Sequence, residues 1–142
     1  MDQAVYILGL DIGSVRIGVA KSLWPDGIPT KVSVLPNDDR FKDNLKELID
    51  ELNAKFIVAG LPRSLNGNET EQTRLITKFV DDLKQTINVP IYLQDEAATS
   101  IKAEEELKAN NKDYSKADID ALSAVYILED FISAHPKGEN LE

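Results

Sequence analysis

Three acidic groups stand at positions where acids are uncommon, and together they could bind a cation. Asp11 interrupts the apolar run VYILGLDI, Asp95-Glu96 closes the run PIYL, and Asp120 lies among alanines in a segment with helical spacing. A carboxylate withdrawn from water is costly unless a hydrogen bond or an opposite charge compensates it. For Asp11, either a turn amide or a bound cation could do so.

One site for all three groups requires that they meet at one edge of a sheet. The segments that end in Asp11 and in Asp95-Glu96 are predicted as parallel strands, and open α/β sheets place their sites at the carboxyl ends of such strands. Small neighbours would let the helix that carries Asp120 approach this edge; they are Ala117, Ala121 and Ala124. Oxygen ligands alone favour Mg²⁺ or Mn²⁺ over zinc, and such ions can promote phosphodiester cleavage.

Each acidic group also has a purely structural interpretation. Asp11 could cap the turn that follows it, and Asp95-Glu96 could be an acid pair at a helix N-terminus, which the macrodipole favours. Asp118 is explained by a capping box with Ser115. Asp120 has no capping role, so the functional interpretation is favoured there.

The composition predicts one domain over residues 1–140, large enough to bury a core. Leu141-Glu142 is set aside as the remnant of an expression tag. There is no cysteine and only one histidine, His135, which excludes thiolate metal sites and disfavours zinc sites and histidine triads. No apolar run reaches the length of a membrane span, and no secretory signal precedes the domain, so we expect a cytoplasmic protein without membrane association.

The net charge of −9, taken alone, argues against a nucleic-acid partner because it repels polyanions. By itself it favours a small-molecule or protein partner. Several bases nevertheless lie in turns or at helix starts that flank the acids, and could form a local basic rim: Arg16, Lys21, Arg63, Arg74, Lys112 and Lys116.

Hydrophobic periodicity predicts the element order β-β-β-α-β-α-β-α-α. Apolar runs on both sides of Gly13-Ser14-Val15 predict a hairpin, and residues 30–35 a third strand. Caps at residues 37–39 precede a helical stripe that ends at Leu52, and KFIVAG at 55–60 predicts a buried strand parallel to the first.

The second half of the order follows from turn residues and caps. Residues 61–68 are predicted as a loop, and Asn68 with Glu71 as a capping box for a helix that ends before Asn88. A short strand at 90–93 follows, then helices over 98–108 and from Ser115 onward. Thr99 is expected to cap the first of these two helices.

Four motifs in this order resemble the YqgF/RuvX family of ribonuclease H-like nucleases, also described as Holliday junction resolvase-like proteins. They are GLDIGSVRIGVA at 9–20, IVAGLPRSLNGNETEQT at 57–73, DEAATS at 95–100 and DIDALSAVYIL at 118–128. The resemblance runs nearly from end to end. It implies a single ribonuclease H-like α/β domain with a five-stranded mixed sheet, the second strand antiparallel, flanked by helices.

The resemblance also implies a site. Asp11, Glu96 and Asp120 would bind Mg²⁺ or Mn²⁺ and carry catalysis. The family is associated with trimming the 5′ end of precursor small-subunit ribosomal RNA and, by analogy, with resolving junctions. The residues that we expect to contact substrate are Arg16, Arg63, Lys116, Gly60, Pro62 and Thr99.

The chain departs from the family pattern among the residues that would contact phosphates. Family members usually follow the acid pair with an arginine, whereas this chain has Ala97 and Ala98. Asn66 stands in place of a frequent aspartate. The three acids themselves are present.

We therefore expect a metal-dependent nuclease that acts on structured RNA, as a monomer or homodimer, with a four-way DNA junction as the rival substrate. A binding module without catalysis is a second class. A third is an ATP-dependent enzyme of the actin, chaperone and sugar-kinase kind, whose first phosphate loop also reads Gly-x-Asp-x-Gly-Ser/Thr. Such enzymes close two related domains over the nucleotide, and 142 residues supply one.

Overall fold

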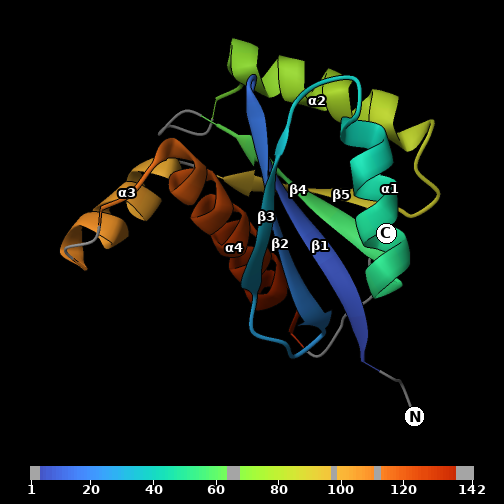
Figure 1. Cartoon of the computed structure of the whole chain (residues 1–142), viewed down its shortest axis with the longest axis horizontal. Coiled ribbons are helices and arrows are strands. Elements are labelled where there is room, and N and C mark those ends of the chain that lie inside the picture. Colours follow the sequence, from blue (N-terminus) through green and yellow to red (C-terminus); the bar gives the residue numbers. More distant parts are fainter. Residues whose placement is uncertain (1–3, 64–67, 97–98, 111–112, 137–142) are drawn as a thin grey trace.

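The computed structural model describes residues 4–63, 68–96, 99–110 and 113–136, and within them one five-stranded sheet is covered by helices on both faces (Figure 1). The predicted element order is confirmed. The elements are β1 Val5–Ile12, β2 Arg16–Trp24, β3 Thr30–Pro36, α1 Phe41–Leu52, β4 Phe56–Pro62, α2 Glu71–Lys84, β5 Ile91–Glu96, α3 Thr99–Ala109 and α4 Lys116–Ala134.

The sheet is mixed, with the strand order β3-β2-β1-β4-β5. β2 runs antiparallel to β1 and places Gly18 opposite Asp11. β4 runs parallel to β1, and β5 runs parallel to β4. The predicted mixed sheet with an antiparallel second strand is confirmed, and the carboxyl ends of β1, β4 and β5 meet at one edge.

The two faces of β1 belong to different cores because side chains alternate along a strand. Leu8, Leu10 and Ile12 pack with α1 and α2. Ile7 packs with α4 on the other face. Asp11 therefore lies on the α4 face and Ile12 on the α2 face, although the two residues are consecutive.

α4 lies directly on the β1–β2 hairpin because glycines leave room for its backbone. A Cβ atom on Gly18 would stand 2.1 Å from the carbonyl oxygen of Asp120, and one on Gly9 would stand 2.6 Å from Cγ of Leu128. Ala121 and Ala124 are buried in the same contact, as their small size predicts. The helix can therefore bring Asp120 close to the strand that holds Asp11.

Two of the predicted helix caps are wrong. α1 has Arg40 as its N-cap, without a side-chain hydrogen bond, while the Asp38 carboxylate accepts the Arg40 N–H at 2.9 Å in the preceding turn. α2 is capped by a box of Thr70 and Thr73 instead of Asn68 and Glu71. The capping box of Ser115 and Asp118 on α4 is confirmed.

The ends of two predicted elements also differ. β4 continues to Pro62, two residues beyond the predicted strand, because its last residues still pair with β5. The Thr73 hydroxyl donates to the Pro62 carbonyl, so α2 starts close to the strand end. α2 ends at Lys84, before the buried Ile87. In the described part of the chain, no helix is long and apolar enough to cross a membrane.

The close approach of α4 makes a stability prediction. Gly18→Ala should lower the free energy of unfolding by about 1–3 kcal/mol, because the added methyl forces α4 away from β2. Urea denaturation measures this change.

Ser123→Ala is the control on the same helix. Its buried hydroxyl has no hydrogen-bond partner among the described residues, so its removal should leave stability unchanged or raise it. Equal stability of Gly18→Ala and wild type would contradict this packing.

Candidate active site

Asp11 and Asp120 are brought together by the packing of α4 on the hairpin. Asp11 pairs with Gly18 across the two strands, and the backbone of Asp120 lies against that glycine. Burial, and after it the negative charge of Asp120, raises the pKa of Asp11 from 3.8 to about 7. The Asp11 carboxylate therefore stands in a place that disfavours its own charge.

Arg16 binds one of these acids. Its Nε donates to Oδ2 of Asp120 at 2.6 Å, and both side chains are only partly exposed. Arg16 is the first residue of β2, directly after the hairpin turn. The predicted substrate contact of Arg16 is thus an ion pair with Asp120 in this structure, which fixes the position of that carboxylate.

The structure separates the two members of the Asp95-Glu96 pair, because consecutive strand residues face opposite ways. The Asp95 side chain is 67% exposed and accepts a hydrogen bond from Nε of Arg63 at 3.2 Å. Glu96 is partly buried, and its Oε1 is buried without a hydrogen-bond partner among the described residues. Glu96 is the member on the side of Asp11, whose charge affects its pKa.

A fourth acid, Asp130 of α4, accompanies Glu96. Burial, and then a side-chain hydrogen bond with Asp130 and its negative charge, raises the pKa of Glu96 from 4.5 to about 9. The charge of Asp11 raises it further, while Lys102 lowers it. Asp130 is not among the residues predicted from the sequence. The signal is its position three residues after Ile127, which packs on the sheet and so marks the inward side of α4.

The chemistry of these side chains fits a hard divalent cation, which prefers oxygen ligands. The pKa values of Asp11 and Glu96 are raised, and among the described residues Oε1 of Glu96 has no hydrogen-bond partner. A positive charge at this place would therefore stabilise the ionised carboxylates. In the described residues, however, no three acids lie close enough together to hold a metal ion. Asp120 is bound to Arg16 and Glu96 to Asp130, so cation binding requires these side chains to change partners.

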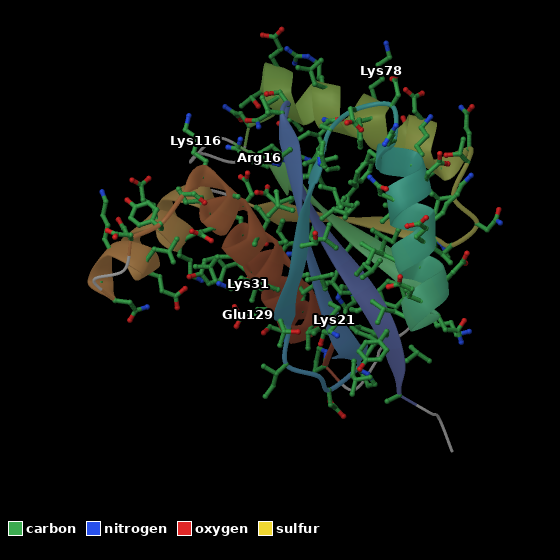
Figure 2. The ribbon with its side chains drawn as sticks, in the orientation of Figure 1. Arg16, Lys21, Lys31, Lys78, Lys116 and Glu129 are labelled. Carbon is green, nitrogen blue, oxygen red and sulfur yellow. The ribbon has the colours of Figure 1, made fainter. Side chains whose placement is uncertain are left out.

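The predicted substrate contacts fall into different environments. Lys116 is the exposed first residue of α4 and lies at the same end of the molecule as Arg16 (Figure 2). Gly60 is buried in β4, as predicted for the strand at 55–60, and an added Cβ would stand 2.4 Å from Cδ1 of Ile127; its contact with substrate stays a prediction. Pro62 is also a strand residue, paired with Glu96.

Lys21 does not belong to the proposed rim. It pairs with Leu8, in the middle of β1, and Figure 2 shows it far from Arg16. Thr99 is the first residue of α3, and its predicted cap and substrate contact rest on a side chain outside the described part. The remaining predictions outside the described residues concern Asn66, Ala97, Ala98 and Lys112.

Asn37 holds the turn that follows Asp11. Its Nδ2 donates to the Gly13 carbonyl at 2.7 Å, and its backbone N–H donates to the Val15 carbonyl at 2.9 Å. Within the turn, the Gly13 N–H donates to the Arg16 carbonyl at 3.0 Å. The predicted helix cap at Asn37 is wrong: its side chain and backbone fix the hairpin turn next to the acidic site.

Comparison with known proteins places the chain in one family. A family model described as "RuvX: Holliday junction resolvase" matches residues 5–134. A protein of Sulfurihydrogenibium sp. (strain YO3AOP1), named "Putative pre-16S rRNA nuclease", is 42% identical over 129 residues, which are 89% of this chain and 88% of the relative. A protein of the same name from Thermoanaerobacter pseudethanolicus is 34% identical, over 90% of this chain and 96% of the relative.

Solved structures of low sequence identity share the fold. RuvC of T. thermophilus, in complex with a Holliday junction substrate, has a TM-score of 0.54 at 12% identity, covering 94% of this chain and 97% of that one. The fowlpox virus Holliday junction resolvase has a TM-score of 0.52 at 14% identity, covering 92% and 99%. These neighbours confirm the predicted ribonuclease H-like fold.

The raised pKa of Asp11 predicts a pH effect on stability. Because folding raises the pKa of Asp11, the folded state binds this proton more tightly than the unfolded state does. The resulting contribution to the free energy of unfolding is fully present below the unfolded pKa of 3.8 and is lost as the pH rises to about 7. Without divalent cations, wild type should therefore lose more stability between about pH 4 and pH 8 than Asp11→Asn, by roughly 4 kcal/mol. Urea denaturation across this range measures the difference. Asp95→Asn, on the exposed face, should follow wild type. Identical pH profiles for Asp11→Asn and wild type would refute the effect.

Proposed function

The chain belongs to the RuvX family of Holliday junction resolvases, and we propose that it is a divalent-metal-dependent nuclease that processes the 5′ end of precursor small-subunit ribosomal RNA. The observation that carries this proposal is that Asp11 and Glu96 lie on the sheet face covered by α4, with strongly raised pKa values, and that α4 places the Asp120 backbone against Gly18, opposite Asp11. The names of the relatives support the substrate. Such a substrate would place the protein in the cytoplasm.

Asp11, Glu96 and Asp120 would hold Mg²⁺ or Mn²⁺. When bound, such an ion lowers the pKa of a coordinated water and neutralises charge on the phosphate. Asp11 and Glu96 must lose their protons before they can act as ligands, and their raised pKa values make this proton release part of binding. We therefore expect tighter cation binding as the pH rises from about 6 to 9.

Arg16 has two possible partners in this proposal. In the structure it holds Asp120 at 2.6 Å. If Asp120 held a cation, the Arg16 guanidinium would be available to bind phosphate oxygens in bidentate fashion. Arg16 thus neutralises the site before substrate binds and contacts the backbone afterwards.

Arg63 and Lys116 are the other proposed backbone contacts. In the Arg63–Asp95 pair the carboxylate is 67% exposed, and pairs that reach solvent contribute little to stability, so a phosphate can replace Asp95 at small cost. Lys116 is exposed at the same end of the molecule as Arg16 (Figure 2). Contacts of this kind position a nucleic acid without reading its sequence. They form a local basic rim on a protein whose net charge is −9.

Each of two rival functions is favoured by a specific observation. A four-way DNA junction is the rival substrate because the family description names it. A binding module without catalysis is motivated by the net charge and by the engagement of Asp120 with Arg16. The ATP-dependent class has less support, since the described residues are organised around a single sheet and supply no second related domain.

Cleavage assays test the proposed activity. Wild type, Asp11→Asn, Glu96→Gln and Asp95→Asn are given precursor small-subunit RNA and a four-way DNA junction, each with and without Mg²⁺. Asp11→Asn and Glu96→Gln should cut RNA at least about 100-fold more slowly, because each removes a negative ligand. Asp95→Asn is the matched control and should remain within a few-fold of wild type.

Three other outcomes of the cleavage assay would each contradict one part of the proposal. Equal rates for Asp11→Asn and wild type would refute the site. Cleavage of the junction but not of RNA would replace the substrate. Cleavage that persists without any divalent cation would refute the metal dependence.

Thermal unfolding tests the cation site without a nucleic acid. Millimolar Mn²⁺ at about pH 8 should raise the Tm of wild type, because a ligand that binds only the folded state stabilises it; at a concentration 100 times the Kd the gain is about 2.7 kcal/mol. Asp11→Asn should show a much smaller rise, and Asp95→Asn the full rise. If Mn²⁺ leaves the Tm of wild type unchanged while RNA still binds, the binding module is the better description.

A further inference from the structure

A cavity of about 420 Å³ lies on the opposite side of the sheet edge from Asp11, between the β1–β2 turn and α2. Apolar side chains form much of its wall, among them Ile12, Leu75 and Phe79. Two side-chain amides, Asn37 and Gln72, also line it. We call it the edge cleft.

The described lining of the edge cleft is neutral, although the protein as a whole carries a charge of −9. Its residues supply apolar contact area and amide groups, and no formal charge. This combination suits a flat, uncharged group with hydrogen-bonding edges and gives no counter-charge to a phosphate. A nucleobase has this chemistry. Side-chain amides pair with base edges, and apolar or aromatic side chains cover base faces.

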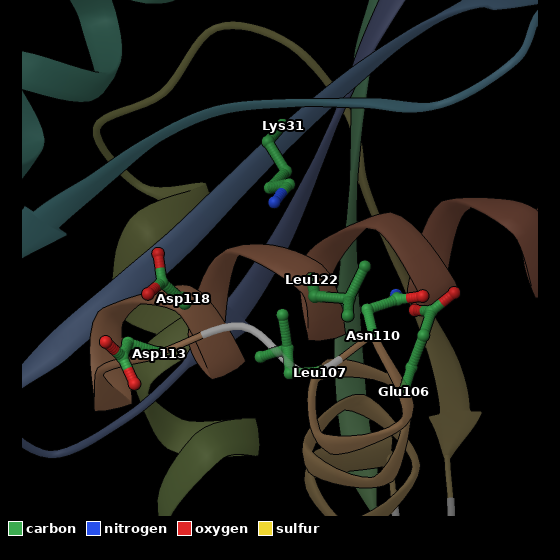
Figure 3. Close-up of a pocket in the computed structure, with 7 residues that line it drawn as sticks. All are labelled: Lys31, Glu106, Leu107, Asn110, Asp113, Asp118 and Leu122. Carbon is green, nitrogen blue, oxygen red and sulfur yellow. The ribbon is translucent and has the colours of Figure 1, made fainter.

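A second cavity of about 310 Å³, between β3, α3 and α4, has the opposite character (Figure 3). Lys31 reaches toward it from the strand, facing the acids Glu106, Asp113 and Asp118. The acids repel phosphates, and two of them have partners: Asp118 binds Ser115, and Glu106 accepts the hydroxyl of Tyr126. The edge cleft is therefore the better place for part of a nucleic acid.

The position of the edge cleft connects it to the acidic site. Asp11 faces α4 and Ile12 faces α2, and the Cα atoms of consecutive residues are about 3.8 Å apart. The cleft is thus reached from Asp11 by crossing the end of one strand. A nucleotide chain with a phosphate at Asp11 would have to pass over the end of β1 to place a neighbouring base in the cleft.

The wall of the edge cleft is both preformed and exposed. Asn37 fixes its rim through the bonds to Gly13 and Val15, and the Phe79 ring packs on Phe41 at a centroid distance of 5.8 Å. Leu75 nevertheless remains 62% exposed. A preformed wall lowers the entropic cost of binding a ligand, and an exposed apolar side chain at a cavity gains from being covered.

We propose that the edge cleft binds an unpaired nucleobase of the substrate next to the phosphate that is cut. The identity of the ligand rests on the proposed nuclease function, which the inference deepens by naming a contact that selects unpaired nucleotides. A base in a continuous duplex is stacked and paired, and cannot enter the cleft without leaving its stack. The enzyme would therefore prefer single-stranded or frayed positions over perfect duplex.

NMR titration tests the cleft without cleavage. Labelled protein, free of divalent cations, is titrated with uridine and adenosine monophosphates and separately with ribose 5-phosphate. Amide signals of Gly13, Gln72 and Leu75 should shift with the nucleotides and not with the sugar phosphate. Leu75→Ala should weaken nucleotide binding about tenfold, because a bound base would no longer cover the apolar area of this exposed leucine. Lys84→Ala, at the exposed end of the same helix, is the matched control and should bind like wild type.

The outcomes separate this inference from the proposed function. Base-dependent shifts in a protein that cuts no nucleic acid support the cleft and refute the nuclease. Cleavage without base-dependent shifts refutes the cleft and leaves the nuclease standing. Shifts of the same amides on raising the protein concentration alone, without any response to nucleotides, would assign the cleft to a second copy of the chain and overturn the inference.

A substrate change tests the same contact during cleavage. An RNA with an abasic residue beside the cut phosphate should raise the KM of wild type about tenfold and change kcat less. In Leu75→Ala, the same abasic residue should have a much smaller effect, because the lost contact is already absent. An equal effect in both proteins would refute the contact.

Discussion

The contact between Gly18 and the Asp120 backbone sets the arrangement of the whole site. Gly18 stands opposite Asp11 in the hairpin, and only a residue without Cβ lets α4 lie so close to it. The same contact that seals the core therefore forces two carboxylates together. Its electrostatic consequence is the pKa of Asp11, about 7. The packing of α4 on the hairpin offsets the electrostatic repulsion between the carboxylates of Asp11 and Asp120.

The acids at this end of the sheet interact with different partners. Asp120 is bound by Arg16, Asp95 by Arg63, and Glu96 shares a hydrogen bond with Asp130. Each arrangement lowers the cost of a carboxylate near others, through an opposite charge or through a retained proton. A cation that binds these acids must compete with these partners. Proton release and side-chain exchange belong to the cost of binding.

Local patterns in the sequence were sufficient for the existence of the strands, their order along the chain and the position of Asp11, because apolar runs and glycine turns depend on neighbouring residues; the mixed five-stranded sheet was implied by the resemblance. The choice between Asp95 and Glu96 required the resemblance, because it depends on where β5 ends relative to α4. Asp130 escaped notice, since its contact with Glu96 joins residues more than thirty positions apart. Residues with several possible local partners, such as Asn37, were also misjudged. Its amide binds a turn that is distant in sequence.

The opposite facing of Asp11 and Ile12 limits how the first strand can change in length. Removal of one residue from β1 ahead of Asp11 would turn the carboxylate into the apolar core beside α1 and α2, and place an apolar side chain beneath α4. Removal of two residues would restore both faces. Insertions and deletions in this strand should therefore be tolerated among homologues only in even numbers. The α2 side of the edge cleft is built partly from exposed residues, so single substitutions there should be tolerated independently of one another.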